Sequence, residues 1–155
     1  MPYRITGLPA DEFSHLFGLD DGALAALGAK RYIVNERPGF PDRIEMRDLE
    51  PGERALLVNY EHHAAATPYR SSHAIFVREG AVERYDRTNE IPEVLRIRLL
   101  SVRSFDAAGM MIDADVLDGS DLESTIARFF ARDEAAYLHV HNAKRGCFAA
   151  RVDRA

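Results

Sequence analysis

The sequence predicts a single α+β domain over residues 1–155, with a mostly antiparallel sheet built from hairpins and three to four short helices packed on it. Two segments in its second half alternate apolar and polar residues on either side of a glycine-containing turn, as antiparallel hairpins do. Other stretches combine helical spacing with capping residues. With 155 residues, 46% of them hydrophobic, and no repeat or flexible linker, one core is expected.

The first forty residues predict two short helices and one strand. Leu8 to Gly18 begins with a proline and two acids, which favour a first helical turn. Asp20 or Asp21 then caps a second helix that Gly28 ends. Residues 31–35 predict a strand, which the run Pro38-Gly-Phe-Pro breaks. The buried side chains expected here are Phe13, Leu16, Phe17, Leu24 and Leu27.

The middle of the chain predicts three more strands, at residues 55–60, 73–78 and 82–85. Residues 92–99 favour a helix after a proline, although their alternation also suits a strand. The run Ser120-Asp-Leu-Glu is a capping box that starts a helix. Its apolar residues follow at helical spacing: Leu122, Ile126, Phe129 and Phe130.

The hairpin over residues 101–116 can be placed in register from side-chain polarity, because a slip by one residue exchanges the faces of a strand. A three-residue loop at 107–109, with glycine in its last position, sets Arg103 opposite Asp113 and Val102 opposite Ala114. Arg103 and Asp113 would then form a cross-strand ion pair. We therefore expect Asp113 to have a structural role.

The hairpin over residues 137–153 is placed in the same way, with a three-residue loop at 144–146. This register pairs His139 with Arg151 and His141 with Ala149, and it leaves an apolar face that includes Phe148. A two- or four-residue loop would place Phe148 among the histidines, so it is disfavoured. The other face becomes a polar, titratable surface: Tyr137, His139, His141, Cys147, Arg151 and Asp153.

Cys147 is a candidate nucleophile, with His141 or His139 as its base. In the predicted register Cys147 and His141 are diagonal neighbours, and the basic residues Lys144 and Arg145 would favour a thiolate. No known cysteine-enzyme signature surrounds Cys147, and a lone cysteine is commonly a small buried hydrophobe.

Histidines suggest a second kind of chemistry, the binding of a divalent metal. His139 and His141 lie on one strand face, and His73 could supply a third ligand, as could His62 or His63. The alternative interpretation is a pair of hydrogen-bonding histidines on a sheet face.

A third candidate is a site for a small anionic ligand, such as a carboxylate or a phosphate. Arginine, serine and tyrosine gather in the segment around residues 69–73 and suit such a ligand. The candidate ligand-binding residues are Tyr69, Arg70, Ser72, His73, Asn142 and Arg151. Because no complete catalytic set can be assembled, a binding domain for such a ligand or for a protein partner is the preferred function.

Composition and charge argue against several other classes of protein. A formal charge of -5 disfavours a nucleic-acid binder, which needs a basic surface. No apolar run is long enough for a membrane helix, and the first residues do not resemble a signal peptide. A single cysteine suits a reducing compartment, so we expect a cytoplasmic protein. A homo-oligomer is compatible with the sequence.

Four segments together resemble a small bacterial family, the domain of unknown function 1203. They are Arg4-Ile-Thr-Gly-Leu-Pro, Pro38-Gly-Phe-Pro, Pro68-Tyr-Arg-Ser-Ser-His-Ala-Ile-Phe-Val and Leu138-His-Val-His-Asn-Ala-Lys. The resemblance extends over essentially the whole chain and implies a bacterial origin. It implies no activity, cofactor or catalytic residue.

Overall fold

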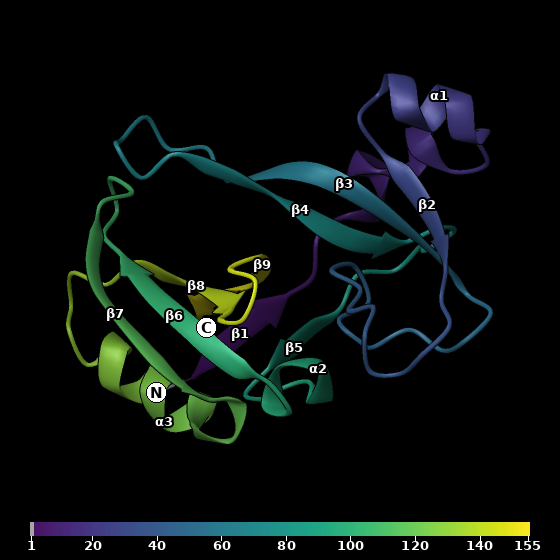
Figure 1. The fold of residues 1–155 in the computed structure, drawn as a ribbon. Coiled ribbons are helices and arrows are strands. Elements are labelled where there is room, and N and C mark those ends of the chain that lie inside the picture. Colours follow the sequence, from purple (N-terminus) through teal and green to yellow (C-terminus); the bar gives the residue numbers. More distant parts are fainter. Residues whose placement is uncertain (1) are drawn as a thin grey trace. The chain divides into compact units, whose positions relative to one another are not determined.

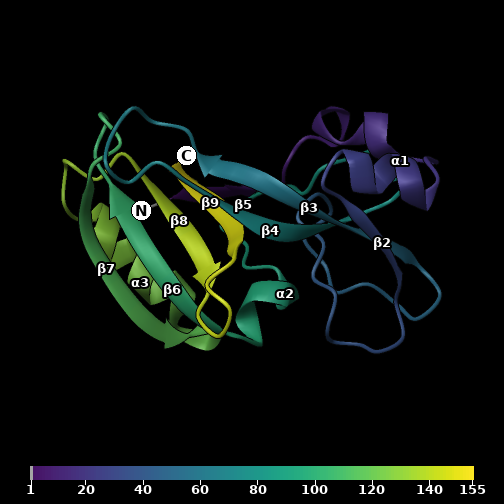
Figure 2. The ribbon, with the colours of Figure 1, turned by 45° about the horizontal axis from the view of Figure 1, so that its top comes forward.

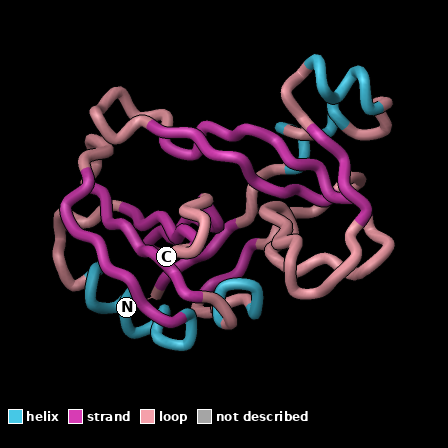
Figure 3. Tube along the Cα trace, in the orientation of Figure 1, coloured by secondary structure: helices cyan, strands magenta, loops and turns pink. Residues whose placement is uncertain are grey.

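A computed structural model describes residues 2–155, which form two compact units (Figure 1). Unit 1 comprises the N-terminal residues to Thr6, together with Glu61–His73 and Asp86–Ala155. Unit 2 comprises Gly7–Tyr60 and Ala74–Tyr85. Strands supply most of the regular structure (Figure 3). The predicted α+β class with antiparallel sheet is thus confirmed, whereas the packing of three to four helices on that sheet is not confirmed.

Unit 1 is built on a six-stranded sheet in which every pair of neighbouring strands is antiparallel. The strands lie in the order β5 (Asp86–Thr88), β1 (Tyr3–Thr6), β9 (Phe148–Arg154), β8 (Tyr137–Asn142), β6 (Leu99–Phe105) and β7 (Met111–Asp118). Both predicted hairpins therefore exist, and β8 is central in the sheet.

Helix α3 (Leu122–Phe130) covers one face of this sheet (Figure 2). Arg128 at its exposed side pairs with Asp115 of β7, and the guanidinium of Arg154 from β9 lies 4.6 Å from the ring centroid of Phe130. The predicted helix is confirmed, but its capping box is not, because a 3₁₀ turn (Gly119–Asp121) precedes α3 and no side chain caps its first turn. The apolar side chains of the helix are buried: Leu122, Ile126, Phe129 and Phe130.

Residues 92–99 combine both interpretations of their pattern. Helix α2 (Glu93–Arg96) follows Pro92, and strand β6 begins at Leu99. The strand predicted at 82–85 is wrong, since a short strand, β5, forms directly after it instead.

Unit 2 carries the three-stranded sheet β2 (Lys30–Ile33), β3 (Arg54–His63) and β4 (Ser71–Arg78), of which residues 61–63 and 71–73 belong to unit 1. Both β3 and β4 are longer than predicted, so His62 and His63 lie on a strand rather than in a loop. The core of this unit includes Val34, Leu49 and Ala55, with Phe40 and Phe76 packed against them.

The N-terminal part of unit 2 matches its prediction at the second helix and departs from it at the first helix and at Leu27. Helix α1 (Asp21–Ala26) is capped as expected, because Oδ1 of Asp20 accepts a hydrogen bond from the amide of Ala23 at 2.8 Å. Two 3₁₀ turns, Ala10–Glu12 and Ser14–Leu16, replace the first predicted helix. Leu27, expected to be buried, is 60% exposed.

Within residues 2–155, no helix combines the length and apolar character needed to cross a bilayer.

Candidate functional site

The candidate site lies on the sheet face of unit 1 opposite to α3, here called the histidine face. Strand pairing places Ser101 beside His141 and Arg103 beside His139, so all four share this face. The pairs Phe105–Tyr137 and His139–Arg151 extend it along and across the strands.

A one-residue irregularity between β8 and β9 changes which residues join the histidine face. The predicted register holds from Tyr137–Asp153 to Val140–Ala150, but His141 is then opposite Phe148 rather than Ala149. Asn142 pairs with Cys147 beyond that point, its amide donating to the Cys147 carbonyl at 2.9 Å. The chain thus uses the disfavoured four-residue turn near its tip, and a bulge restores the predicted pairing farther away.

This bulge moves Phe148 onto the histidine face and places Cys147 opposite Asn142. The predicted diagonal pairing of Cys147 with His141 was based on the other register and is wrong. Nδ2 of Asn142 donates to Sγ of Cys147 at 3.6 Å. A catalytic role of Cys147 with His141 or His139 stays a prediction.

A second bulge, between β6 and β7, separates Arg103 from the acid predicted to neutralise it. The predicted register survives only near the turn, at Phe105–Met111, and from Ser104 onward the strands are shifted by one residue. Arg103 is therefore opposite Ala114, and Asp113 is opposite Ser104. Asp113 then lies on the face that α3 covers, and its Oδ2 is 3.7 Å from Nη1 of Arg132, two residues after the helix ends. The predicted Arg103–Asp113 pair is wrong.

Residues 61–73 of unit 1 lie against the histidine face. The His62 ring stacks on Phe148, with ring centroids 5.3 Å apart, and lies edge-on to His141 at 4.9 Å. His63 stacks on Phe105 at 4.3 Å, and its Nε2 is 2.9 Å from the Tyr137 hydroxyl. His62 and His63 thus join His139 and His141 in one cluster of rings.

This covering buries the two central histidines. His139 is 2% exposed and His141 is 1% exposed, so the prediction of an open, titratable surface is wrong for both. Burial, with smaller effects from neighbouring positive or protonatable groups, lowers the pKa of His139 to about 2. Burial likewise lowers the pKa of His141 to about 3. Both imidazoles are therefore neutral at pH 7.

Hydrogen bonding fixes the tautomer of His141. Its Nδ1 lies 2.9 Å from the carbonyl oxygen of Gly146, and a carbonyl oxygen can only accept. In the neutral ring the proton must then be on Nδ1, which leaves Nε2 with a bare lone pair. Among the described residues, Nε2 of His141 is buried and has no hydrogen-bond partner.

Arg103 stands apart from the other arginines proposed for this region. Its half-buried side chain folds back along β6, and Nε donates to the Ser101 hydroxyl at 3.4 Å. It forms no ion pair with any residue in the described part of the chain, and burial lowers its pKa. Arg70 and Arg151, by contrast, pair with Glu61 at 3.1 Å and with Asp153 at 2.8 Å.

The remaining predicted site residues are more dispersed. Tyr69 is 39% exposed and lies edge-on to Phe105, while Ser72 is exposed and His73 is half-buried on β4. Asn142 is buried beside Cys147. Within residues 2–155, no group of three or more His, Cys, Asp or Glu side chains is placed so that it could hold a metal ion.

Sequence reasoning missed Arg103 as a functional candidate because it assigned this residue an acidic partner. That assignment assumed a hairpin without a bulge. A bulge shifts the pairing of the two strands but does not change which residues they contain, so the composition of the strands does not reveal it. A signal was nevertheless present, since Asp113 and Asp115 flank a single small residue and can face Arg128 and Arg132 instead.

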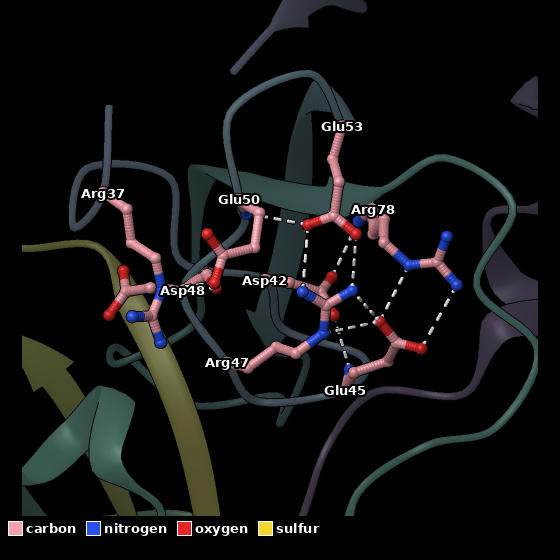
Figure 4. Close-up of polar contacts among 8 residues, drawn as sticks. All are labelled: Arg37, Asp42, Glu45, Arg47, Asp48, Glu50, Glu53 and Arg78. Atoms are coloured by element: carbon pink, nitrogen blue, oxygen red, sulfur yellow. Dashed lines mark hydrogen bonds and ion pairs between the residues drawn. The ribbon is translucent and has the colours of Figure 1, made fainter. Parts of the chain in front are cut away.

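Unit 2 holds a second cluster of polar residues, and its charges are paired with one another (Figure 4). Arg47 bridges Glu45 and Glu53 at 3.0 and 2.8 Å, and Arg78 pairs with Glu45 at 2.8 Å. The Arg47 guanidinium, with further hydrogen bonding, lowers the pKa of Glu53 to about 2. These contacts tie residues 45–53 to β4, and we assign them a structural role.

Asp42 stabilises the same region through the backbone, and its replacement by alanine should weaken the fold. Asp42 is 1% exposed, and its carboxylate accepts from the amides of Glu45 and Arg78 at 2.6 and 2.7 Å. Asp42→Ala leaves both amides without an acceptor, so we expect a loss of about 2–5 kcal/mol in the free energy of unfolding, measured with urea at pH 7. Exposed Asp11→Ala is the control, with an expected change within about 0.5 kcal/mol. A loss below about 1 kcal/mol for Asp42→Ala would contradict this role.

Comparison with known proteins gives one family. The family model described as "Protein of unknown function (DUF1203)" matches residues 39–154, which include β8, β9 and the histidines that cover them. No curated protein and no solved structure matches the chain.

Proposed function

Because the chain belongs to the DUF1203 family, whose function is unknown, its own residues must suggest its activity, and we propose that it binds a small anionic ligand at Arg103. The observation that carries this proposal is the half-buried guanidinium of Arg103, which has no carboxylate partner among the described residues. A charge that is partly removed from water is costly unless an opposite charge or hydrogen bonds compensate it.

The neighbours of Arg103 suit an anion. The Ser101 hydroxyl lies under the guanidinium and can donate a hydrogen bond of its own. The cross-strand neighbours of these two residues are the neutral rings of His141 and His139, which add no negative charge. An arginine can also bind a carboxylate or a phosphate through two parallel hydrogen bonds.

The charge around the site indicates how many anionic groups the ligand carries. The chain has a net charge of -5, and the other arginines of the histidine face, including Arg151, are paired with acids. A single unpaired guanidinium suits one carboxylate or phosphate group, whereas a nucleic acid would require an extended basic surface.

Thermal unfolding in the presence of small anions tests the proposal. At a concentration of 100 times Kd, a bound anion should raise Tm by about 5–10 °C. The panel is phosphate, sulfate, glycolate and acetate at constant ionic strength. Arg103→Gln should abolish the shift, because glutamine keeps much of the length but removes the charge.

Two matched variants separate this site from general charge effects. Arg128→Gln removes an arginine on the opposite face that pairs with Asp115, and Arg70→Gln removes one that pairs with Glu61. Both should keep the anion-induced shift of the unmodified protein. If no anion raises Tm, or if Arg103→Gln responds like the unmodified protein, the proposal is wrong.

A further inference from the structure

We infer that the ligand carries an O–H group beside its negative charge, and that this group donates a hydrogen bond to Nε2 of His141 while Arg103 holds the anionic oxygens. The inference rests on the anion site proposed above and specifies the class of anion. Two kinds of compound share this chemistry: a protonated phosphate and a 2-hydroxycarboxylate.

The hydrogen-bonding capacity of His141 determines which group the ligand must supply. The Gly146 carbonyl fixes the proton on Nδ1, so Nε2 can accept a hydrogen bond but cannot donate one. This atom is buried and has no partner in the described part of the chain. Buried polar atoms without a partner are costly in folded proteins. Nδ1 of His139 also has no partner among the described residues, but only in His141 does the bond of the other nitrogen to a carbonyl fix the bare atom as an acceptor. We therefore assign to this atom a donor from outside the chain.

Nε2 of His141 lies on the same sheet face as the positive charge of Arg103. Ser101 is the direct cross-strand neighbour of His141, and Nε of Arg103 lies 3.4 Å from the Ser101 hydroxyl oxygen. Directly opposed residues of an antiparallel pair have Cβ atoms roughly 5 Å apart. The bare acceptor and the guanidinium are thus carried by neighbouring positions on one face of the sheet.

The protonation state of His141 determines whether it accepts a hydrogen bond or removes a proton. Burial and the nearby charge of Arg103 contribute to a pKa of about 3, so His141 stays unprotonated at pH 7. His141 is thus suited to accept a hydrogen bond from the ligand rather than to remove its proton. The predicted role is recognition and requires no chemical step.

The inferred geometry discriminates between anions of similar size. Phosphate near neutral pH carries at least one O–H group, and glycolate carries a hydroxyl next to its carboxylate. Sulfate and acetate have only acceptor oxygens, so each would present a lone pair to the lone pair of Nε2. Loss of one such hydrogen bond in a buried site changes affinity by roughly 5- to 150-fold.

Calorimetric titration of the unmodified protein at pH 7.5 tests the inference with two pairs, phosphate against sulfate and glycolate against acetate. We expect the hydroxylated member of at least one pair to bind about 10-fold or more tightly than its partner. The pair that shows the difference identifies the phosphate or the hydroxycarboxylate as the source. Equal affinities within both pairs overturn the inference and leave the anion site intact. Absence of binding by all four anions overturns both.

A variant then tests the assignment to His141. In His141→Gln the side-chain amide can turn its N–H₂ group toward the ligand, so sulfate or acetate should bind more tightly and the ratio within the discriminating pair should fall toward one. His15→Gln, at an exposed position of unit 2, is the control and should keep the ratio. An unchanged ratio in folded His141→Gln overturns the assignment. If that variant does not fold, the comparison of anion pairs in the unmodified protein decides the inference.

Discussion

Lowering the pH from 7 to 4.5 should reduce the free energy of unfolding by about 5 kcal/mol, mainly through His139 and His141. Burial holds their pKa values at about 2 and about 3 in the folded chain, against 6.5 for an exposed histidine. Each group then contributes a slope of about 1.4 kcal/mol per pH unit below pH 6.5. Because small proteins have a total stability of roughly 5–15 kcal/mol, this change can unfold the chain.

Proton uptake explains why acid lowers the free energy of unfolding. Between the folded and unfolded pKa values the unfolded chain binds protons at both histidines and the folded chain does not, so acid favours the unfolded state. Stability is therefore complete above pH 6.5 and falls as the pH decreases toward 3. The pKa of Glu53 is also lowered, from 4.5 to about 2, so its contribution to stability is lost mainly below pH 4.5. The range from pH 6.5 to 4.5 therefore separates the effect of the two histidines from that of Glu53.

Urea unfolding at several pH values measures this effect. His139→Gln should reduce the slope of unfolding free energy against pH by about half in this window, whatever its effect on stability at pH 7. His15→Gln, at an exposed position of unit 2, should leave the slope unchanged. A stability that stays constant between pH 6.5 and 5 would show that the two imidazoles are not buried as neutral groups.

Gly119→Ala should destabilise the protein by about 3 kcal/mol or more. A Cβ atom at this position would lie 2.0 Å from the carbonyl oxygen of Leu95 and 2.7 Å from that of Arg96. Both atoms belong to the backbone, so no side-chain rotation relieves the overlap, and the turn before α3 must move away from α2. Urea unfolding at pH 7, or the yield of folded protein if the variant is too unstable, measures the loss.

Gly22→Ala is the control for this prediction. A Cβ atom at Gly22 meets nothing closer than 3.6 Å, and the residue lies on the exposed side of α1. Alanine favours the helix over glycine, so this variant should gain about 0.5–1 kcal/mol. A Gly119→Ala variant as stable as the unmodified protein would contradict the close approach of the two turns.

Local patterns in the sequence predicted the features that local physics determines. The Asp20 cap of α1, the amphipathic spacing of α3 and the pairing of the 137–153 hairpin away from its turn were all confirmed. The family resemblance was also confirmed by the match over residues 39–154.

The site itself depended on features that such patterns do not contain. Each bulge adds one residue to one strand, so it changes the face of Phe148 or Asp113 without altering the apolar content of either hairpin. The burial of His139 and His141 comes from His62 and His63, which are far away in the sequence. A single sequence gives no measure of such long-range pairing.

The order of strands in unit 1 also constrains how the chain folds during synthesis. β1 leaves the ribosome well before its partner β9, because Ile5 pairs with Val152. Unit 2, in contrast, has all its residues by Tyr85. Because β9 also pairs with β8, the sheet that carries Arg103 and His141 closes late, through contacts of very high sequence separation. A nascent chain therefore completes its histidine face only after β9 has left the ribosome.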